Sequence, residues 1–179
     1  MKKGGVGGGN TITGINFEGR ADILTLIAKL PGYKVKEAEI GHDIFYKNQL
    51  VANSYKQRTF YKFLESQGVD WKKVISRQLL PDDAIYVVKD NTLYILELKY
   101  QEGEGSVDEK LQTSAFKRQQ YQKLMAPLNR EVEYIYVLND WFKHPKYKDV
   151  LDYVISVDCH YYFEYLPLHK IGLPVPAQE

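Results

Sequence analysis

The sequence predicts an α/β protein with a mixed central β-sheet that has helices on both faces. Stretches with helical spacing of apolar residues alternate with short runs rich in β-branched and aromatic residues, which is typical of layered α/β folds. Hydrophobic residues make up 44% of the 179-residue chain, which is enough to cover such a sheet on both sides. Because no repeat or linker divides the chain, we expect a flexible glycine-rich arm over residues 1–10 and a single domain over residues 11–179.

The first half of the chain predicts two helices around a set of short strands. Apolar residues follow helical spacing over residues 16–30, and a Pro-Gly pair ends the run. Residues 34–55 predict short strands separated by turns, and residues 56–67 predict a second helix that ends at a glycine. A strand over residues 74–80 is expected to lead into a hairpin over residues 81–101.

The second half of the chain continues the alternation of helices and strands. A long helix is expected over residues 108–125. Residues 132–138 predict a buried strand, which a loop over residues 139–148 joins to a short helix over residues 149–155. A last strand is expected over residues 160–166.

Charge and cysteine content exclude several classes of protein. The chain has 24 Lys and Arg against 23 Asp and Glu, so its surface is not uniformly basic, although a basic cleft balanced by acids elsewhere remains compatible with this ratio. A single cysteine, Cys159, allows no intrachain disulfide and no cysteine zinc site. No apolar run approaches the length of a membrane span, and the start of the chain lacks the apolar region of a signal peptide. We therefore expect a cytoplasmic protein with no membrane contact.

The hairpin over residues 81–101 carries charged residues within otherwise apolar strands. These are Asp82, Asp83, Glu97 and Lys99. Charged side chains are seldom buried unless they pair with one another or bind a metal ion. The alternative is that Asp82 is a turn residue and that Glu97 and Lys99 form an ordinary surface pair. Both strands are apolar on both faces, which argues against that alternative.

The turn of the hairpin predicts which of these residues share a face of the sheet. A two-residue loop at Asp90-Asn91 would place Asp82 opposite Lys99. Glu97 would then lie on the same face as both, while Asp83 would point to the other side. A four-residue loop keeps this arrangement of faces, whereas a three-residue loop exchanges the two aspartates.

Two carboxylates and a lysine on one face suit the hydrolysis of a phosphodiester. Two adjacent carboxylates repel each other unless a cation lies between them. Mg²⁺ prefers oxygen ligands, and when it is bound it activates water and stabilises the charge that develops on a phosphate. A lysine at a partly desolvated position can orient or deprotonate that water.

These residues resemble the signature of a known superfamily. Pro81-Asp82 followed by Glu97-Leu98-Lys99 resembles the PD-(D/E)xK motif of nucleases, and a glutamine two residues after the lysine, Gln101 here, is similar to the pattern of type II restriction endonucleases. The resemblance implies a restriction-endonuclease-like core in the order α-β-β-β-α-β. That order is similar to the one predicted from residue 16 onwards.

The resemblance also implies roles for single residues. Asp82 and Glu97 would be metal ligands, with the Leu98 carbonyl as a third, for one or two Mg²⁺ ions in the active site. Lys99 would position the attacking water, so that Asp82, Glu97 and Lys99 are the catalytic residues. Glu18 is similar to a glutamate that many members place near the metal; the alternative is an exposed helix acid. Gln101 is either the trailing glutamine of the family or a polar loop residue.

The function that the resemblance implies is sequence-specific cleavage of double-stranded DNA, leaving 5′-phosphate ends. Type II restriction endonucleases of this kind are usually homodimers, and no small-molecule cofactor is implied. One alternative is a structure-specific nuclease of the junction-resolvase or repair type, against which the net charge of +1 argues. Another is a non-catalytic nucleic-acid-binding module that retains the hairpin.

Two polar segments are candidates for contact with DNA, because Lys and Arg bind phosphates while Asn, Gln and Arg read bases. On the first, Lys110 and Lys117 are expected on one helix face, away from the apolar stripe. In both segments the alternative is a solvated surface. The candidates in the first are Lys110, Gln112, Thr113, Ser114, Lys117 and Arg118, and those in the second are Asn139, Lys143 and His144.

Overall fold

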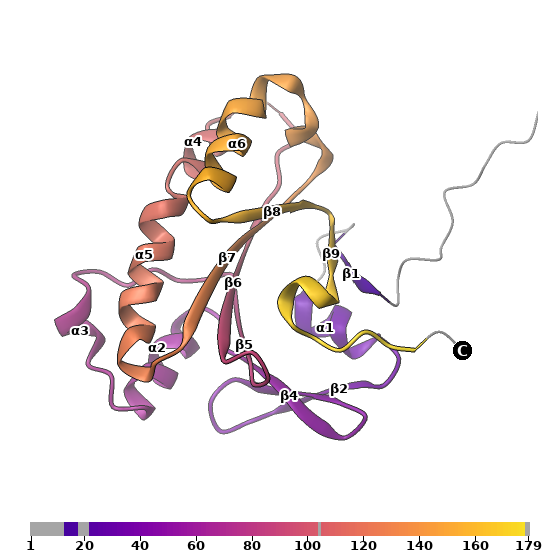
Figure 1. Cartoon of the computed structure of the whole chain (residues 1–179), viewed down its shortest axis with the longest axis vertical. Coiled ribbons are helices and arrows are strands. Elements are labelled where there is room, and N and C mark those ends of the chain that lie inside the picture. The colour runs from indigo at the N-terminus through magenta and orange to yellow at the C-terminus, as the bar shows by residue number, and fades with distance from the viewer. Residues whose placement is uncertain (1–12, 18–21, 104, 178–179) are drawn as a thin grey trace, which may run out of the picture.

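The computed structural model describes residues 13–17, 22–103 and 105–177 (Figure 1). The arm predicted over residues 1–10 and the candidate Glu18 lie outside the described residues. No helix in the described part of the chain has the length and apolar character needed to cross a membrane.

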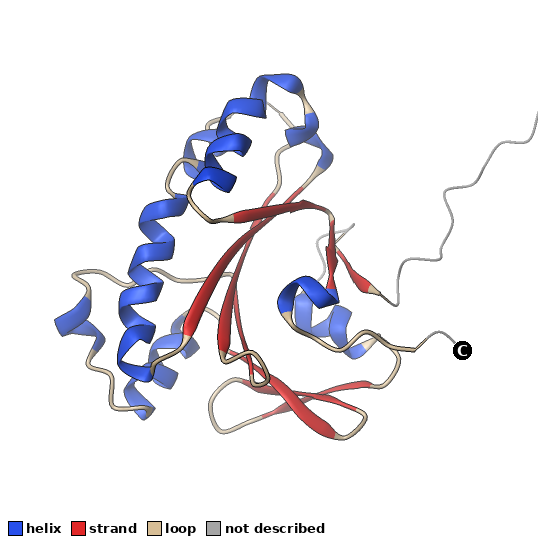
Figure 2. Cartoon of the chain, viewed as in Figure 1, coloured by secondary structure: helices blue, strands red, loops and turns tan. Residues whose placement is uncertain are grey.

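A mixed sheet forms the centre of the protein, as the sequence predicted, and it has seven strands in the described chain (Figure 2). The strands lie in the order β2-β3-β4-β5-β6-β7-β8, and neighbours are antiparallel from β2 to β6 and parallel from β6 to β8. The strands are β2 (Tyr33–Glu37), β3 (His42–Tyr46), β4 (Gln49–Ser54), β5 (Asp83–Val87), β6 (Thr92–Lys99), β7 (Glu131–Leu138) and β8 (His160–Phe163).

Helices cover both faces of this sheet, and each face has its own core of buried side chains (Figure 1). Five helices pack on the first face: α2 (Arg58–Ser66), α3 (Trp71–Val74), α4 (Val107–Leu111), α5 (Ser114–Met125) and α6 (Lys148–Ser156). The second face is covered by α1 (Ile23–Ala28), the 3₁₀ helix η4 (Leu168–Ile171) and a two-stranded sheet of β1 (Gly14–Asn16) and β9 (Tyr165–Pro167). The other 3₁₀ helices are η1 (Ala126–Leu128), η2 (Asp140–Lys143) and η3 (Pro145–Tyr147).

The predicted helix over residues 16–30 was wrong in its first part. Gly14–Asn16 is a strand that pairs with Tyr165–Pro167, nearly the whole chain away. The helix begins only at Ile23, because the Asp22 carboxylate accepts a hydrogen bond from the Thr25 amide at 3.1 Å and caps its N-terminus. The predicted strand over residues 160–166 is likewise two strands, which belong to different sheets and meet at Glu164 with a positive φ of 55°.

Two other predicted elements differ from the structure. The residues that the sequence predicted as a strand over 74–80 form no strand in the described chain, and Trp71–Val74 is a helical turn. The helix predicted over residues 108–125 is divided into α4 and α5 at Gln112-Thr113. The Thr113 hydroxyl donates to the Lys110 carbonyl at 2.7 Å, which is the competition with the helical ladder expected of a threonine.

The single cysteine lies in the core of the first face and gives a direct test of that packing. Cys159 is fully buried, and burial raises the pKa of its thiol to about 11. We expect no reaction with a thiol reagent in the native protein near pH 8, because only the exposed thiolate reacts. The measurement is labelling with and without denaturant. Rapid stoichiometric labelling of the native protein would contradict the described core.

Candidate active site on the hairpin

The hairpin of β5 and β6 has the predicted arrangement of faces but a different register. Val87 pairs with Thr92 and Asp83 pairs with Leu96, so the loop has four residues, Val88 to Asn91. The predicted pairing of Asp82 with Lys99 was therefore wrong by two residues. The longer loop is closed by a hydrogen bond from the Asn91 amide to the Val88 carbonyl at 3.4 Å, and Asn91 takes a positive φ of 51°.

A shift by two residues leaves the faces unchanged, since side chains alternate along a strand. Ala84, Leu93 and Ile95 belong to the core of the first face, and Ile85 and Leu96 to that of the second. Asp82, Glu97 and Lys99 consequently share the first face, under helix α5. This is the arrangement that the sequence predicted.

Three oxygen atoms surround the ammonium group of Lys99. Its Nζ lies 2.9 Å from Glu97 Oε2, 3.3 Å from the Leu98 carbonyl oxygen and 3.8 Å from Asp82 Oδ2. The side chains of Glu97 and Lys99 are 6% and 17% exposed, whereas that of Asp82 is 40% exposed. The cluster is therefore buried at one end and open to solvent at the other.

The position of Asp82 is fixed by a backbone contact. Its Oδ2 accepts a hydrogen bond from the Leu98 amide at 2.9 Å, just before the ladder of β5 begins. Burial and the nearby charge of Glu97 raise the pKa of the Asp82 carboxyl, and Lys99 acts in the opposite direction. The charge of Glu97 thus disfavours the charged form of Asp82, and a cation between the two carboxylates relieves this.

A second lysine reaches the cluster from helix α5. Lys117 Nζ lies 3.3 Å from Glu97 Oε2, the same oxygen that Lys99 contacts. The expectation that Lys117 lies away from the apolar stripe was wrong. It is four residues before Tyr121, which is buried against the sheet, and residues four apart share a helix face. The spacing to Tyr121 is the signal that could have found Lys117.

The donor atoms present fit a hard divalent ion. The oxygens of Asp82, Glu97 and Leu98 already converge on one cationic group, and Mg²⁺ in proteins is held by one or two carboxylates with water completing its shell. Within the described residues no group of three or more His, Cys, Asp and Glu side chains could hold a metal. The protein ligands would therefore be two carboxylates and one carbonyl.

Asp83 lies on the other face of the sheet, as predicted. It is 5% exposed and faces Lys56, whose Nζ is 3.6 Å from Asp83 Oδ1. Lys56 also pairs with Asp22, the residue that caps α1. Burial raises the pKa of Asp83 to about 7, against the opposing charge of Lys56. The two adjacent aspartates therefore belong to separate ion-pair clusters.

The raised pKa of Asp83 predicts a pH-dependent stability. Between the unfolded pKa near 4 and the folded pKa of about 7, the folded state retains a proton that the unfolded state loses, so raising the pH destabilises the fold. Relative to Asp83→Asn, the wild-type free energy of unfolding should fall by about 2 kcal/mol between about pH 5 and about pH 8. Urea unfolding of both proteins at the two pH values measures this. A constant difference would contradict it.

Gln101 supports the loop that follows β6. It is 7% exposed, and its Nε2 donates to the carbonyl oxygens of Gly103 at 2.7 Å and Gly105 at 3.3 Å. The Asn139 side chain binds the backbone of Gln101 from the neighbouring strand end, with Nδ2 donating to its carbonyl oxygen at 2.7 Å and Oδ1 accepting from its amide at 3.2 Å. The Gln101 and Asn139 side chains therefore hold the chain at the carboxyl-terminal ends of β6 and β7, beside Lys99.

The two segments predicted to face DNA meet in the structure. Gln112 from the first segment, and Lys146 and Tyr147 from the second, line one groove of about 540 Å³ together with Asp108, Asp149, Val150 and Tyr153. Not all candidates are on the surface: Ser114 is fully buried, so the prediction that it contacts DNA was wrong.

The other candidates in these segments differ in exposure. Lys110, Gln112, Thr113, Lys143 and His144 are exposed. Arg118 is half-buried, with its guanidinium 3.9 Å from Asp158. The exposed candidates therefore lie on α4, between α4 and α5, and at the end of η2.

Comparisons with known proteins give no relative from which a function could be transferred. No family model, no curated protein and no solved structure matches this chain. The function is therefore inferred from the residues of the site.

Proposed function

We propose that the protein is a Mg²⁺-dependent endonuclease that hydrolyses phosphodiester bonds of double-stranded DNA at specific sequences, as type II restriction enzymes do. The observation that carries the proposal is the set of three oxygens, from Asp82, Glu97 and Leu98, within 3.8 Å of the Lys99 ammonium. Two carboxylates, a backbone carbonyl and two lysines thus lie within one partly buried cluster.

The surrounding fold supports a core of the restriction-endonuclease kind. Strands β4, β5 and β6 are antiparallel neighbours, with α2 and α3 between β4 and β5 in the chain, and α4 and α5 then connect β6 to the parallel strand β7. The carboxyl ends of β6 and β7 lie side by side, with Lys99 paired to Leu138. Ligands in α/β sheets commonly bind at such ends.

Each residue of the site has a distinct part in the proposed reaction. Asp82, Glu97 and the Leu98 carbonyl would hold the ion, which when bound supplies a Lewis acid for the charge that develops on the phosphate. The Lys99 ammonium, placed between the two carboxylates, would orient the attacking water toward phosphorus. Lys117 approaches from α5 and would contact a phosphate oxygen once Glu97 engages the ion.

Two parts of the proposal concern partners. Double-stranded DNA would lie across the groove between α4 and η3, which Gln112 and Lys146 line together with Asp108 and Asp149, and Lys146 would contact a phosphate. Cleavage of both strands of a palindromic site would require a homodimer, since the symmetry of the protein matches that of the site.

Incubation of the purified protein with plasmid DNA tests the proposed function. With Mg²⁺ we expect discrete fragments, and with EDTA we expect none, because the carboxylates alone supply no Lewis acid. Cutting confined to branched DNA would instead indicate a structure-specific nuclease. Absence of cutting of plasmid and branched DNA with every divalent metal would contradict the enzymatic function.

A further inference from the structure

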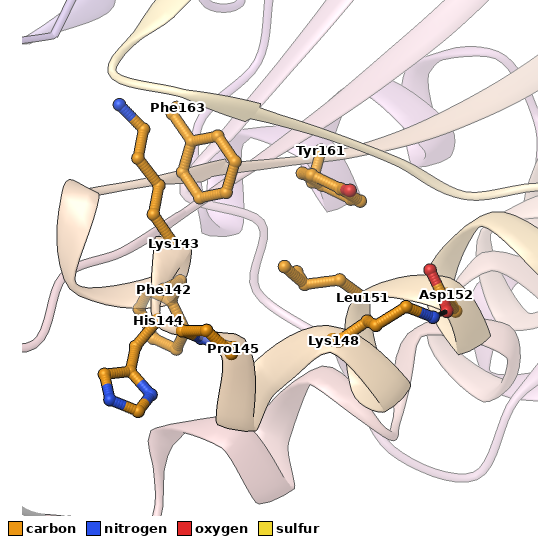
Figure 3. Close-up of a pocket in the computed structure, with 9 residues that line it drawn as sticks. All are labelled: Phe142, Lys143, His144, Pro145, Lys148, Leu151, Asp152, Tyr161 and Phe163. Carbon is orange, nitrogen blue, oxygen red and sulfur yellow. Dashed lines mark hydrogen bonds and ion pairs between the residues drawn. The ribbon is translucent and has the colours of Figure 1, made fainter.

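A pocket separate from the candidate active site lies between β8 and the segment from η2 to α6 (Figure 3). Its volume of about 320 Å³ is at the small end of the range for ligand pockets. Tyr161 and Phe163 project from β8 on one side, Leu151 points toward them from α6, and the buried ring of Phe142 closes the base. The pocket thus offers mainly aromatic and apolar surface to one small group.

The register of the sheet links this pocket to the candidate active site. Glu97 pairs with Tyr136, which pairs with Tyr161, and in the next row Lys99 pairs with Leu138, which pairs with Phe163. All of these side chains lie on the first face of the sheet. Two strand spacings separate Lys99 from Phe163, a distance of about 10 Å between backbones. Along one strand of stacked DNA this corresponds to about three nucleotides.

Basic side chains stand at the mouth of the pocket. Lys143 Nζ lies 5.3 Å from the centroid of the Phe163 ring, and Lys148 and His144 also line the opening. Each lysine has an acidic partner, Asp140 for Lys143 and Asp152 for Lys148. These pairs are exposed, so they contribute little and can be exchanged for a phosphate. The lining therefore combines aromatic rings with cations, which suits an anionic aromatic ligand.

We propose that this pocket binds an unstacked nucleobase of the DNA strand that the candidate active site cleaves. Every base has a π-face that stacks on Tyr and Phe rings, and a base leaves the duplex when an enzyme draws it into a pocket. The phosphates on either side of that base would meet Lys143 and Lys148. That the ligand belongs to DNA rests on the proposed function. That the ligand is a base rests on the aromatic rings of Tyr161 and Phe163 in the pocket.

Strand-binding measurements test the pocket independently of cleavage. The full-length protein is titrated in EDTA with a short fluorescent single strand, and with a strand of equal length in which every base is replaced by an abasic site. We expect the normal strand to bind about tenfold more tightly, because stacking acts only on bases. Phe163→Ala should remove this preference and leave the affinity for the abasic strand unchanged.

Two matched variants control for effects on folding. Tyr162→Ala changes the neighbouring residue of β8, which packs against the core of the second face, and should keep the preference for bases. Phe163→Trp keeps an aromatic stacking surface and should also keep the preference for the strand with bases. Equal affinity of the wild type for both strands, or an unchanged preference in Phe163→Ala, would overturn the inference.

Parallel cleavage and sedimentation measurements separate this inference from the proposed function. If the protein cleaves plasmid DNA but binds the normal and the abasic strand equally well, the inference about the pocket is wrong and the proposed nuclease function stands. If Phe163→Ala removes the preference for the normal strand, but the wild type cleaves no DNA with any divalent metal, the base-binding pocket is supported and the proposed nuclease function is wrong. If Phe163→Ala dissociates a dimer while strand preference is unchanged, the pocket holds a side chain of a second copy and the inference is wrong.

Discussion

Replacing Glu97 by glutamine should lower DNA cleavage by about 10³-fold or more, while the protein remains folded and still binds DNA. Glu97 is the most buried carboxylate of the cluster, and its Oε2 contacts both Lys99 and Lys117. The amide keeps the shape of the side chain but removes the charge that a divalent ion requires. Initial rates of plasmid cleavage and the Kd for DNA in EDTA give the two quantities.

The matched control for this variant is Asp83→Asn. Asp83 is also a buried acid of the same hairpin, but it faces Lys56 on the opposite side of the sheet. We expect Asp83→Asn to retain cleavage within about a factor of ten, since this pair has no contact with Lys99. If Asp83→Asn were inactive and Glu97→Gln active, the assignment of faces would be wrong.

Replacing Lys99 by methionine should reduce the cleavage rate by about 10²–10⁴-fold, the range expected for loss of a group that orients or transfers a proton. Methionine keeps most of the apolar length of the side chain, so packing changes little. In this account Lys99 acts on the attacking water, so the loss should fall on kcat. The rate constant is obtained from single-turnover cleavage at saturating protein.

Lys117→Met separates the roles of the two lysines. Among the described residues, the ion-pair partner of Lys117 is Glu97, at 3.3 Å, and Lys117 comes from α5 rather than from the hairpin. Its loss should weaken DNA binding and reduce the salt dependence of binding, because one phosphate contact is removed. Equal losses of kcat in both lysine variants, with unchanged DNA affinity, would contradict separate roles.

The faces of the candidate site could be predicted from the sequence because they depend on a local rule. Side chains alternate along a strand, so Asp82, Glu97 and Lys99 share a face in the predicted and in the observed register. The register itself could not be predicted, because the loop is held by distant residues. Asn91 Nδ2 donates to the Asn129 carbonyl at 2.8 Å, and the Asn91 carbonyl accepts from the Glu131 amide at 3.2 Å.

Other differences also come from contacts between segments far apart in the chain. The strand Gly14–Asn16 exists because it pairs with Tyr165–Pro167, and three residues carry no periodic signal of their own. The burial of Lys117 depends on how α5 is rotated on the sheet, which Tyr121 and Leu124 determine through packing. The apolar run of β7 was predicted to within one residue, because a buried strand of this length is visible in the local sequence.

Calorimetric titration of the protein with Mg²⁺ or Mn²⁺, without DNA, tests most directly whether Asp82 and Glu97 form a metal site. We expect one or two ions per chain to bind to the wild type and to Asp83→Asn, and none to bind at these positions in Glu97→Gln. Equal binding to the wild type and Glu97→Gln would contradict the account. So would the absence of binding to the wild type, which would leave Lys99 and Lys117 as the only cations that the two carboxylates hold.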